Sequence, residues 1–443
     1  MTVQRSPRLE ALLGGSLIDR DVLEYAHLQL LIDGQVPEAE DLDYKRDLYG
    51  NTDKDKRSLS TDVAALASTR GGLLILGIDE DEQGRAKDFC DVALSDAEFT
   101  RMLQIIASGT APLPTFEIIP VENPAKPGFG CYVISVAAGP RQPYAVPVSD
   151  GYRYPRRIGT TIGYLTEPEI ETAYHRRDVA RRDQRARADE IEQDVSYHIT
   201  HDYPWVLISL VPDHPGEAPV NATTFSHVRN SYMGASPWLV SRMSNWQRVT
   251  LGQRRFVVDD QWGQVVGARA ATALLYDDGA GVFAACPRFG GDESSTYDLH
   301  DELLVESILA GVLLLAEHAR ERANVAGHVS LRATLTPADS AVQSRLLHPR
   351  GFRDALGHPA SVTSFRPATA AALVDHLVAG PELVSTAALL STEFFQGFGL
   401  AETLQISQAG EVRLPYWSNR GPQEEIRWWA EKHGINVTDA ALR

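Results

Sequence analysis

Two stretches decide the fold of this chain. They are Glu38-Ala39-Glu40-Asp41-Leu42-Asp43-Tyr44-Lys45 and Ala67-Ser68-Thr69-Arg70-Gly71-Gly72-Leu73-Leu74-Ile75-Leu76-Gly77-Ile78-Asp79. The first sets carboxylates and a lysine on a short amphipathic run. The second is a turn of small residues that leads into an apolar run and ends in an acid. A short apolar run bounded by glycines is typical of a buried strand, so we expect a central strand over residues 73–78 with Asp79 at its end.

Further strands and helices follow this strand along the chain. The apolar patterns predict a helix over residues 96–108 and strands over 116–120 and 131–136, the last beside 73–78. A second helix is expected to begin near Thr166, with the threonine as its cap and Pro168 in its first turn. These elements indicate an α/β (α+β) fold.

The same stretches resemble the Schlafen AlbA-type domain, also called AlbA_2 and formerly grouped with divergent AAA domains. The family opening, Glu followed after four residues by Glu-Phe-Lys, is matched by Glu38 and residues 43–45. Its Ala-Asn-Thr-x-Gly-Gly and Gly-Val-x-Asp segments are matched by residues 67–72 and 77–79. Its closing Tyr-x-x-Arg-x-Gly-Ser/Thr-Ser/Thr signature is matched by residues 154–161. Asp43 stands where Glu is usual and Ser68 where Asn is usual, within a resemblance that covers about residues 36–175.

The resemblance implies a catalytic and metal-binding site made of Glu38, Asp43 and Asp79, the acidic triad of the RNase-active Schlafen proteins. In those relatives the triad supports metal-dependent cleavage of structured RNA, notably tRNA, which here implies Mg²⁺ or Mn²⁺, ions that prefer oxygen ligands. Glu38 and Asp43 are five residues apart, and helix neighbours are three or four apart. They converge only if the chain bends between them or if one lies before a helix and the other within it. The alternative is an unrelated set of surface acids, since the chain holds 59 Asp and Glu.

Basic residues in the same region predict contacts with nucleic acid. Lysine and arginine neutralise phosphates, which dominates nucleic-acid affinity, and nearby tyrosines can stack on bases. A solvated charged loop is the alternative for residues 51–57. The candidate nucleic-acid-binding residues are Lys45, Lys54, Lys56, Arg57, Arg156 and Arg157.

Composition excludes several classes of protein. The net charge of −17 argues against nucleic-acid binding by the whole surface. Three widely spaced cysteines offer neither a disulfide framework nor a zinc pair. The chain lacks a Gly-x-x-x-x-Gly-Lys-Ser/Thr motif, so no P-loop nucleotide site is expected. It also lacks an eighteen-residue apolar run and a signal peptide, so we expect a cytoplasmic protein without membrane contact.

The length of 443 residues predicts two or three domains. We expect a helical extension over residues 1–35, a Schlafen-like domain over 36–166 and a charged, solvated linker helix over 167–193. A separate α+β domain over 194–443 would serve regulation or partner binding. Within it, the pattern predicts a long apolar helix over 298–323 and another helix near 369–378.

Three functions stay open at this point. The first, implied by the resemblance, is an RNA-binding protein that cleaves tRNA or other structured RNA; some bacterial fusions of such domains act in phage defence. The other implication of the resemblance is a non-catalytic DNA-binding or regulatory protein. A third alternative is an assembly module that binds a second copy or a partner protein through the C-terminal domain. Convergence of the three carboxylates in an open groove would distinguish the nuclease from the others.

Overall fold

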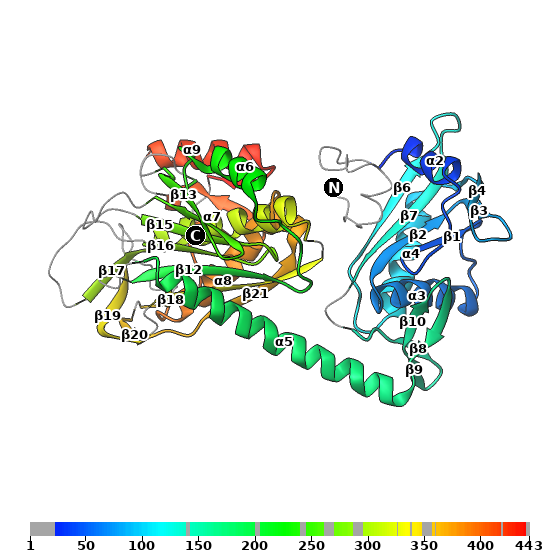
Figure 1. Cartoon of the computed structure of the whole chain (residues 1–443), viewed down its shortest axis with the longest axis horizontal. Coiled ribbons are helices and arrows are strands. Elements are labelled where there is room, and N and C mark those ends of the chain that lie inside the picture. Colours follow the sequence, from blue (N-terminus) through cyan, green and yellow to red (C-terminus); the bar gives the residue numbers. More distant parts are fainter. Residues whose placement is uncertain are drawn as a thin grey trace. The chain divides into compact units, whose positions relative to one another are not determined.

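The structure of the chain is a computed structural model with two compact units, Met1–Arg182 and Asp183–Arg443. Helices and strands occur in both units, which confirms the α+β fold class (Figure 1). The structure describes residues 23–138, 142–199, 204–239, 245–260, 270–286, 296–325, 327–336, 339–347, 357–358, 360–417 and 420–439.

The first unit is built on a five-stranded sheet. Strand β2 (Gly71–Leu76) lies between β1 (Leu42–Lys45), which is parallel to it, and β7 (Phe129–Ala137), which is antiparallel. β6 (Phe116–Glu122) and β5 (Val92–Ala93) also pair with β7. Every residue of β2 is buried. The predicted central strand and its neighbour over 131–136 are therefore confirmed.

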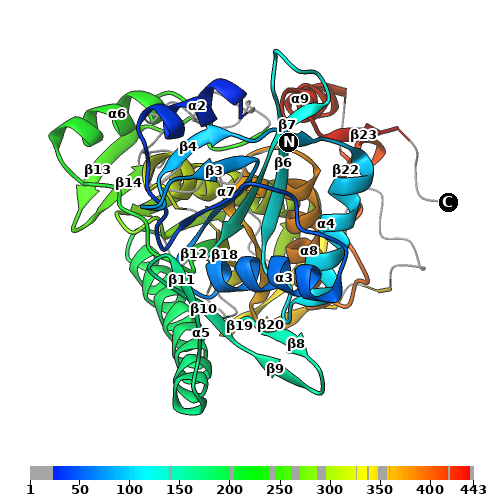
Figure 2. The same ribbon diagram turned by 90° about the vertical axis from the view of Figure 1, so that its right-hand side faces the viewer.

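Helices cover both faces of this sheet because the side chains of β2 alternate. Leu74 and Leu76 pack in one cluster with α3 (Asp53–Ala67) and α4 (Asp96–Gly109). Leu73 and Ile75 pack on the other face with α2 (Tyr25–Asp33). Figure 2 shows α3 and α4 against the sheet. Most of the predicted N-terminal extension, up to residue 22, lies outside the described residues.

Gly77 ends the central strand earlier than predicted. Its φ of +104° is a conformation that favours glycine, and it separates β2 from β3 (Ile78–Glu80). β3 pairs with β4 (Ala86–Phe89) in a two-stranded ribbon of its own. Asp79 consequently lies in that ribbon and not at the end of the central strand.

Two hairpins complete the first unit. β8 (Val146–Val148) pairs with β9 (Gly151–Arg153), and β10 (Pro155–Ile158) pairs with β11 (Thr161–Tyr164). In the second hairpin Arg157 is opposite Ile162 and Pro155 is opposite Tyr164. Because side chains alternate along a strand, these four residues share one face of the hairpin.

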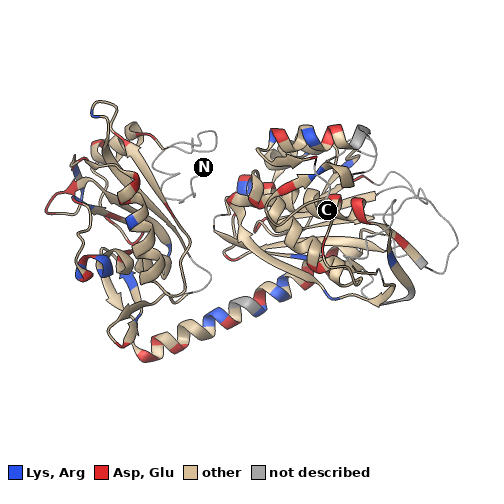
Figure 3. Ribbon diagram, turned by 180° about the vertical axis from the view of Figure 1, so that it is seen from behind, with Lys and Arg blue, Asp and Glu red and all other residues tan. Residues whose placement is uncertain are grey.

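The charged helix α5 (Glu167–Ser196) is longer and less solvated than predicted. Figure 3 shows acidic and basic residues interleaved along it. Ala188, Ile191 and Val195 near its end are buried against the second unit's sheet. Glu192 is also buried and pairs with Arg332 at 2.8 Å. The prediction of a wholly solvated linker helix over 167–193 is therefore wrong for the end of the helix, where apolar residues recur at helical spacing and are buried.

The second unit contains a seven-stranded antiparallel sheet between helices. Alternate side chains of its strands pack on the end of α5 and on a larger cluster with α7 (Asp301–Glu317) and α8 (Pro381–Gln396). The strands in spatial order are β13 (Arg248–Gly252), β14 (Arg255–Asp259), β15 (Ala270–Tyr276), β16 (Gly281–Cys286), β12 (Trp205–Pro212), β18 (His328–Thr336) and β21 (Ala368–Leu373). The remaining elements are α6 (Ala222–Tyr232), β17 (Thr296–His300), β19 (Asp339–Leu347), β20 (Val362–Ser364), β22 (Glu411–Arg413), α9 (Arg420–Lys432) and β23 (Asn436–Thr438).

Two helix predictions in this unit need correction. The apolar helix begins at Asp301, because residues 296–300 form β17, and it ends in a π-helical turn, His318–Arg322. Residues 368–373 form strand β21 instead of a helix, because pairing with β18 overrides the helix propensity of its alanines. Of the predicted helix near 369–378, Val374–Leu377 is helical, as a short 3-10 helix. In the described part of the chain, no helix is long and apolar enough to cross a membrane.

Candidate functional site

A tight turn brings the first two predicted acids together. Ala39 and Leu42 exchange backbone hydrogen bonds of 3.0 and 3.3 Å, which fold the chain back between Glu38 and Asp43. Glu38 Oε1 accepts a hydrogen bond from the Tyr44 backbone N–H at 2.9 Å. The two carboxyl groups are close enough for each to shift the pKa of the other. The bend that convergence required is thus the turn that leads into β1.

Two cations neutralise Asp43 inside the domain. Lys45 Nζ lies 2.8 Å from Asp43 Oδ2, and the Arg157 guanidinium lies 3.1 Å from Oδ1. Only 2% of the Arg157 side chain and 4% of the Asp43 side chain are exposed. Arg157 also donates to the Ala39 carbonyl at 3.1 Å, and its backbone N–H donates to Thr69 Oγ1 at 3.0 Å. The predicted nucleic-acid contact of Arg157 needs correction, since this side chain is a buried structural ion.

The environment separates the acidities of the two carboxyl groups. Burial raises the pKa of Glu38 to about 7, and the neighbouring Asp43 adds to this shift against the hydrogen bond from Tyr44. Burial alone would also raise the pKa of Asp43, but Lys45 and Arg157 outweigh it, so this pKa lies below its usual value. Asp43 is consequently the ionised member of the pair, and Glu38 is the member that holds a proton near neutral pH.

Asp79 does not join the pair. It lies 3.8 Å from the Arg46 guanidinium, and the further acid whose charge acts on Glu38 is Glu80. Within the described ranges, no three Asp, Glu, His or Cys side chains form a group that could hold a metal ion. With both Asp43 oxygens facing cations, the arrangement does not fit the Mg²⁺ or Mn²⁺ site that the sequence implied.

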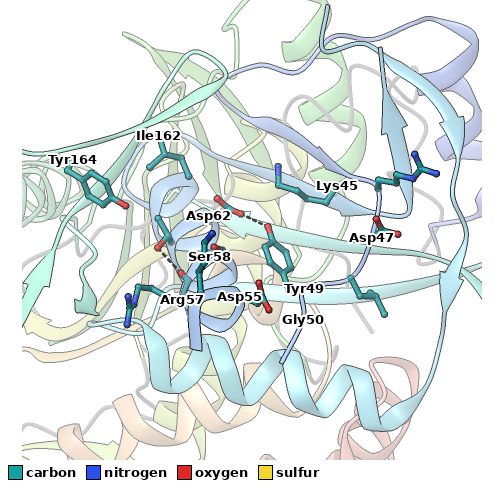
Figure 4. A pocket seen from close by; sticks show the side chains of 14 residues that line it. Lys45, Asp47, Tyr49, Gly50, Asp55, Arg57, Ser58, Asp62, Ile162 and Tyr164 are labelled. Carbon is teal, nitrogen blue, oxygen red and sulfur yellow. Dashed lines mark hydrogen bonds between the residues drawn. The ribbon is translucent and has the colours of Figure 1, made fainter. Parts of the chain in front are cut away.

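An open hollow lies beside this network, between α3, the 45–50 segment and β11. We call it the α3 hollow; its volume is about 710 Å³, within the range typical of ligand sites. Figure 4 shows Tyr164 and Ile162 on one side of it, Lys45 and Tyr49 on another, and Asp62 between them. Its charged and aromatic lining residues are Lys45, Arg46, Lys54, Arg57, Asp47, Asp55, Asp62, Tyr49 and Tyr164.

A carboxyl–phenol pair within the hollow was missed by sequence reasoning. The Tyr49 hydroxyl donates a hydrogen bond to Asp62 Oδ2. Burial raises the pKa of Asp62 to about 6, although the bond from Tyr49 acts in the opposite direction. Asp62 lies on α3, a helix that the sequence pattern did not predict. The available signal was Thr52, which caps α3 in a capping box with Asp55.

The other predicted basic residues divide between two places. Lys54 and Arg57 are exposed on the first turns of α3 and line the hollow, so residues 53–57 are helical and not a loop. Lys56 lines a neighbouring depression of about 190 Å³. Arg156 pairs with Glu169 at 2.7 Å on the surface.

Comparison with known families identifies this part of the chain. Residues 38–166 match the family described as Schlafen, AlbA_2. These residues are a Schlafen AlbA_2 domain. The match spans less than a third of the chain, and it connects the Schlafen AlbA_2 domain with nucleic-acid-related function. No curated protein matches the chain.

One solved structure similar to the chain is a crystal structure of the DIP2311 protein from Corynebacterium diphtheriae. The two chains are 19% identical in the aligned part, with a TM-score of 0.22. The alignment covers 32% of this chain and 26% of that one, so it spans about a quarter of the DIP2311 protein's length.

Proposed function

We propose that the Schlafen AlbA_2 domain of this chain binds RNA through the α3 hollow. The observation that supports this most is the convergence of four cationic side chains on one open hollow, in a chain whose net charge is −17. Clustered lysine and arginine provide the phosphate-neutralising part of nucleic-acid affinity. The acidic remainder of the surface would repel phosphates and direct them to this place.

The cations of the hollow differ in availability. Lys54 and Arg57 are exposed and form no ion pair with any described residue. Lys45 pairs with Asp43, and Arg46 lies near Asp79. Lys54 and Arg57 are three residues apart on α3, so they lie on the same side of the helix. These two residues are therefore the primary phosphate contacts, and Lys45 is a secondary one.

Binding is favoured over metal-dependent cleavage for a geometric reason. Cleavage of the kind that the resemblance implied needs three carboxylates at one point, and Asp79 is held in the β3–β4 ribbon. The Glu38–Asp43 pair is instead joined to Lys45 and Arg157. This network stabilises the edge of the sheet that carries the hollow.

The test is fluorescence anisotropy of the whole protein with labelled RNA over a range of salt concentrations. The Lys54→Glu, Arg57→Glu double variant should weaken binding and lower the slope of log affinity against log salt. Two lost phosphate contacts should reduce this slope by about 1.4, from about 0.7 per contact on a single strand. The matched control is Lys87→Glu, an exposed lysine on β4 that does not line the hollow.

Two outcomes would contradict the proposal. The first is a wild-type protein that binds no RNA at low salt. The second is an equal loss of RNA affinity in the Lys87→Glu control and in the double variant. Incubation of total RNA, tRNA and DNA with and without Mn²⁺ belongs in the same experiment. If the wild type cleaves RNA in a metal-dependent way and both Glu38→Ala and Asp43→Ala abolish this cleavage, the nuclease function would replace the binding proposal.

A further inference from the structure

Exposed tyrosine and isoleucine side chains are frequent in the segment that contributes Tyr164 to the wall of the α3 hollow. Tyr152, Ile158, Tyr164 and Tyr174 lie within 23 residues of sequence, and each exposes more than 40% of its surface. Of these four, only Tyr164 lines the hollow. Its exposed fraction is 45%, so its ring is accessible from the space in which a bound phosphate backbone would lie.

The surroundings of Tyr164 hold its ring in place. It is opposite Pro155 in the β10–β11 hairpin, which fixes its backbone. The Arg153 guanidinium lies over its ring, 5.2 Å from the centroid. Ile162 on the same hairpin face extends the apolar wall of the hollow. The ring is therefore held by its backbone pairing and by the Arg153 guanidinium while 45% of the residue stays exposed.

Tyr49, the other tyrosine of the hollow, has a different role. Its hydroxyl is bonded to Asp62, and burial is the first cause of the raised pKa of this hydroxyl. It is part of the hollow's framework, so its ring is a poor platform for a ligand. Tyr164 is the aromatic side chain that combines exposure with a place in the wall.

We infer that Tyr164 stacks on an unpaired base and thereby gives the α3 hollow a preference for single-stranded over duplex RNA. This inference rests on the proposed function. In a duplex the flat faces of the bases are covered by neighbouring base pairs, so a wall tyrosine has no face to stack on. In a single strand each base has an accessible face, and phosphates on Lys54 and Arg57 would leave a base free to reach Tyr164.

The test uses the whole protein and three labelled RNAs of equal length: an unstructured single strand, the same backbone without bases, and a blunt duplex. Tyr164→Ala should weaken binding of the single strand about 5- to 150-fold, the range that corresponds to stacking on one base. It should leave binding of the abasic strand and the duplex unchanged. Tyr164→Phe keeps the ring and should bind the single strand like the wild type.

The matched control is Tyr152→Ala, which removes a tyrosine that is 61% exposed on β9 but does not line the hollow. It should change affinity by no more than about twofold, as is usual for a surface substitution. Equal affinity of wild type and Tyr164→Ala for the single strand would overturn the inference, as would an equal loss on the abasic strand. If Tyr164→Ala had no such effect but the Lys54→Glu, Arg57→Glu double variant still lost RNA affinity, the proposed function would remain supported without the stacking inference. Absence of RNA binding by the wild type would remove both.

Discussion

Arg157→Ala should destabilise the first unit more than the removal of an arginine from an exposed ion pair does. Arg157 and Asp43 are 3.1 Å apart and almost completely buried, and Arg157 also holds the turn before β1 through the Ala39 carbonyl. Removing the guanidinium leaves a buried carboxylate with Lys45 alone. The Lys45 side chain is 37% exposed, so its charge is partly screened by water.

The size of the effect follows from this geometry. Breaking a buried ion pair by removing one partner costs about 3–5 kcal/mol. Because Lys45 remains 2.8 Å from Asp43, we expect the lower end, about 3 kcal/mol. For a unit of this size, each kcal/mol lowers the melting temperature by about 2–4 °C, so the transition of the first unit should fall by about 6–12 °C.

Calorimetry of the whole protein measures the shift, and hydrogen exchange with mass spectrometry shows where it arises. Peptides of β1 and β2 should lose protection, and peptides of the second unit should not. The control is Arg156→Ala, the neighbouring arginine whose pair with Glu169 is 39% and 37% exposed. Such surface pairs contribute about 0–1 kcal/mol. Equal effects of the two variants would refute the structural role of the Arg157–Asp43 pair.

Four further predictions concern pH, metal ions and helix α5. Glu38 has a folded pKa of about 7, above its usual 4.5. The stability that protonated Glu38 contributes is therefore full below pH 4.5 and is lost as the pH rises through 7. Glu38→Gln should remove this loss in denaturant titrations. RNA affinity should rise as the pH falls through 6, because Asp62 then loses its negative charge in the hollow, and Asp62→Asn should abolish this rise. Millimolar Mn²⁺ should raise the melting temperature no more than NaCl of equal ionic strength; a specific rise that Asp43→Asn removes would contradict the described network. Limited trypsin treatment should cut α5 after the exposed Arg176, Arg182 or Arg185 and spare Arg187, which pairs with Asp278 at 3.0 Å; a first cut after Arg187 itself would speak against the packing of the helix end.

The parts of the fold that local sequence determines were predicted well. The run from Gly71 to Leu76 is apolar on both faces, and a strand with that composition can only be central in a sheet with helices on both sides. The approach of Glu38 to Asp43 required a bend, and the turn at residues 39–42 supplies it. In both cases the determining residues are close together in sequence.

The parts that long-range contacts determine could not be predicted. Arg157 and the Ala39 carbonyl are 118 residues apart, so nothing near Arg157 in the sequence shows that it is buried. The same holds for Asp62, whose pKa is raised by burial and also responds to the charge of the distant Arg157. The position of Asp79 depended on one backbone angle at Gly77, which the sequence allows without requiring.

Neutralisation of Asp43 by Lys45 and Arg157 would explain how an acidic chain could hold the proposed RNA site next to a pair of carboxyl groups. If Lys45 and Arg157 did not neutralise Asp43, its charge would oppose a phosphate in the adjacent hollow. Because Asp43 is neutralised within the protein, its charge does not reduce the attraction of Lys54 and Arg57 for phosphates. Loss of Arg157 should therefore weaken RNA binding even though this side chain cannot contact RNA. At a temperature where the Arg157→Ala variant is still folded, its RNA affinity should fall, and adding Asp43→Asn should restore it. A double variant that binds as weakly as Arg157→Ala alone would show that the effect is structural and not electrostatic.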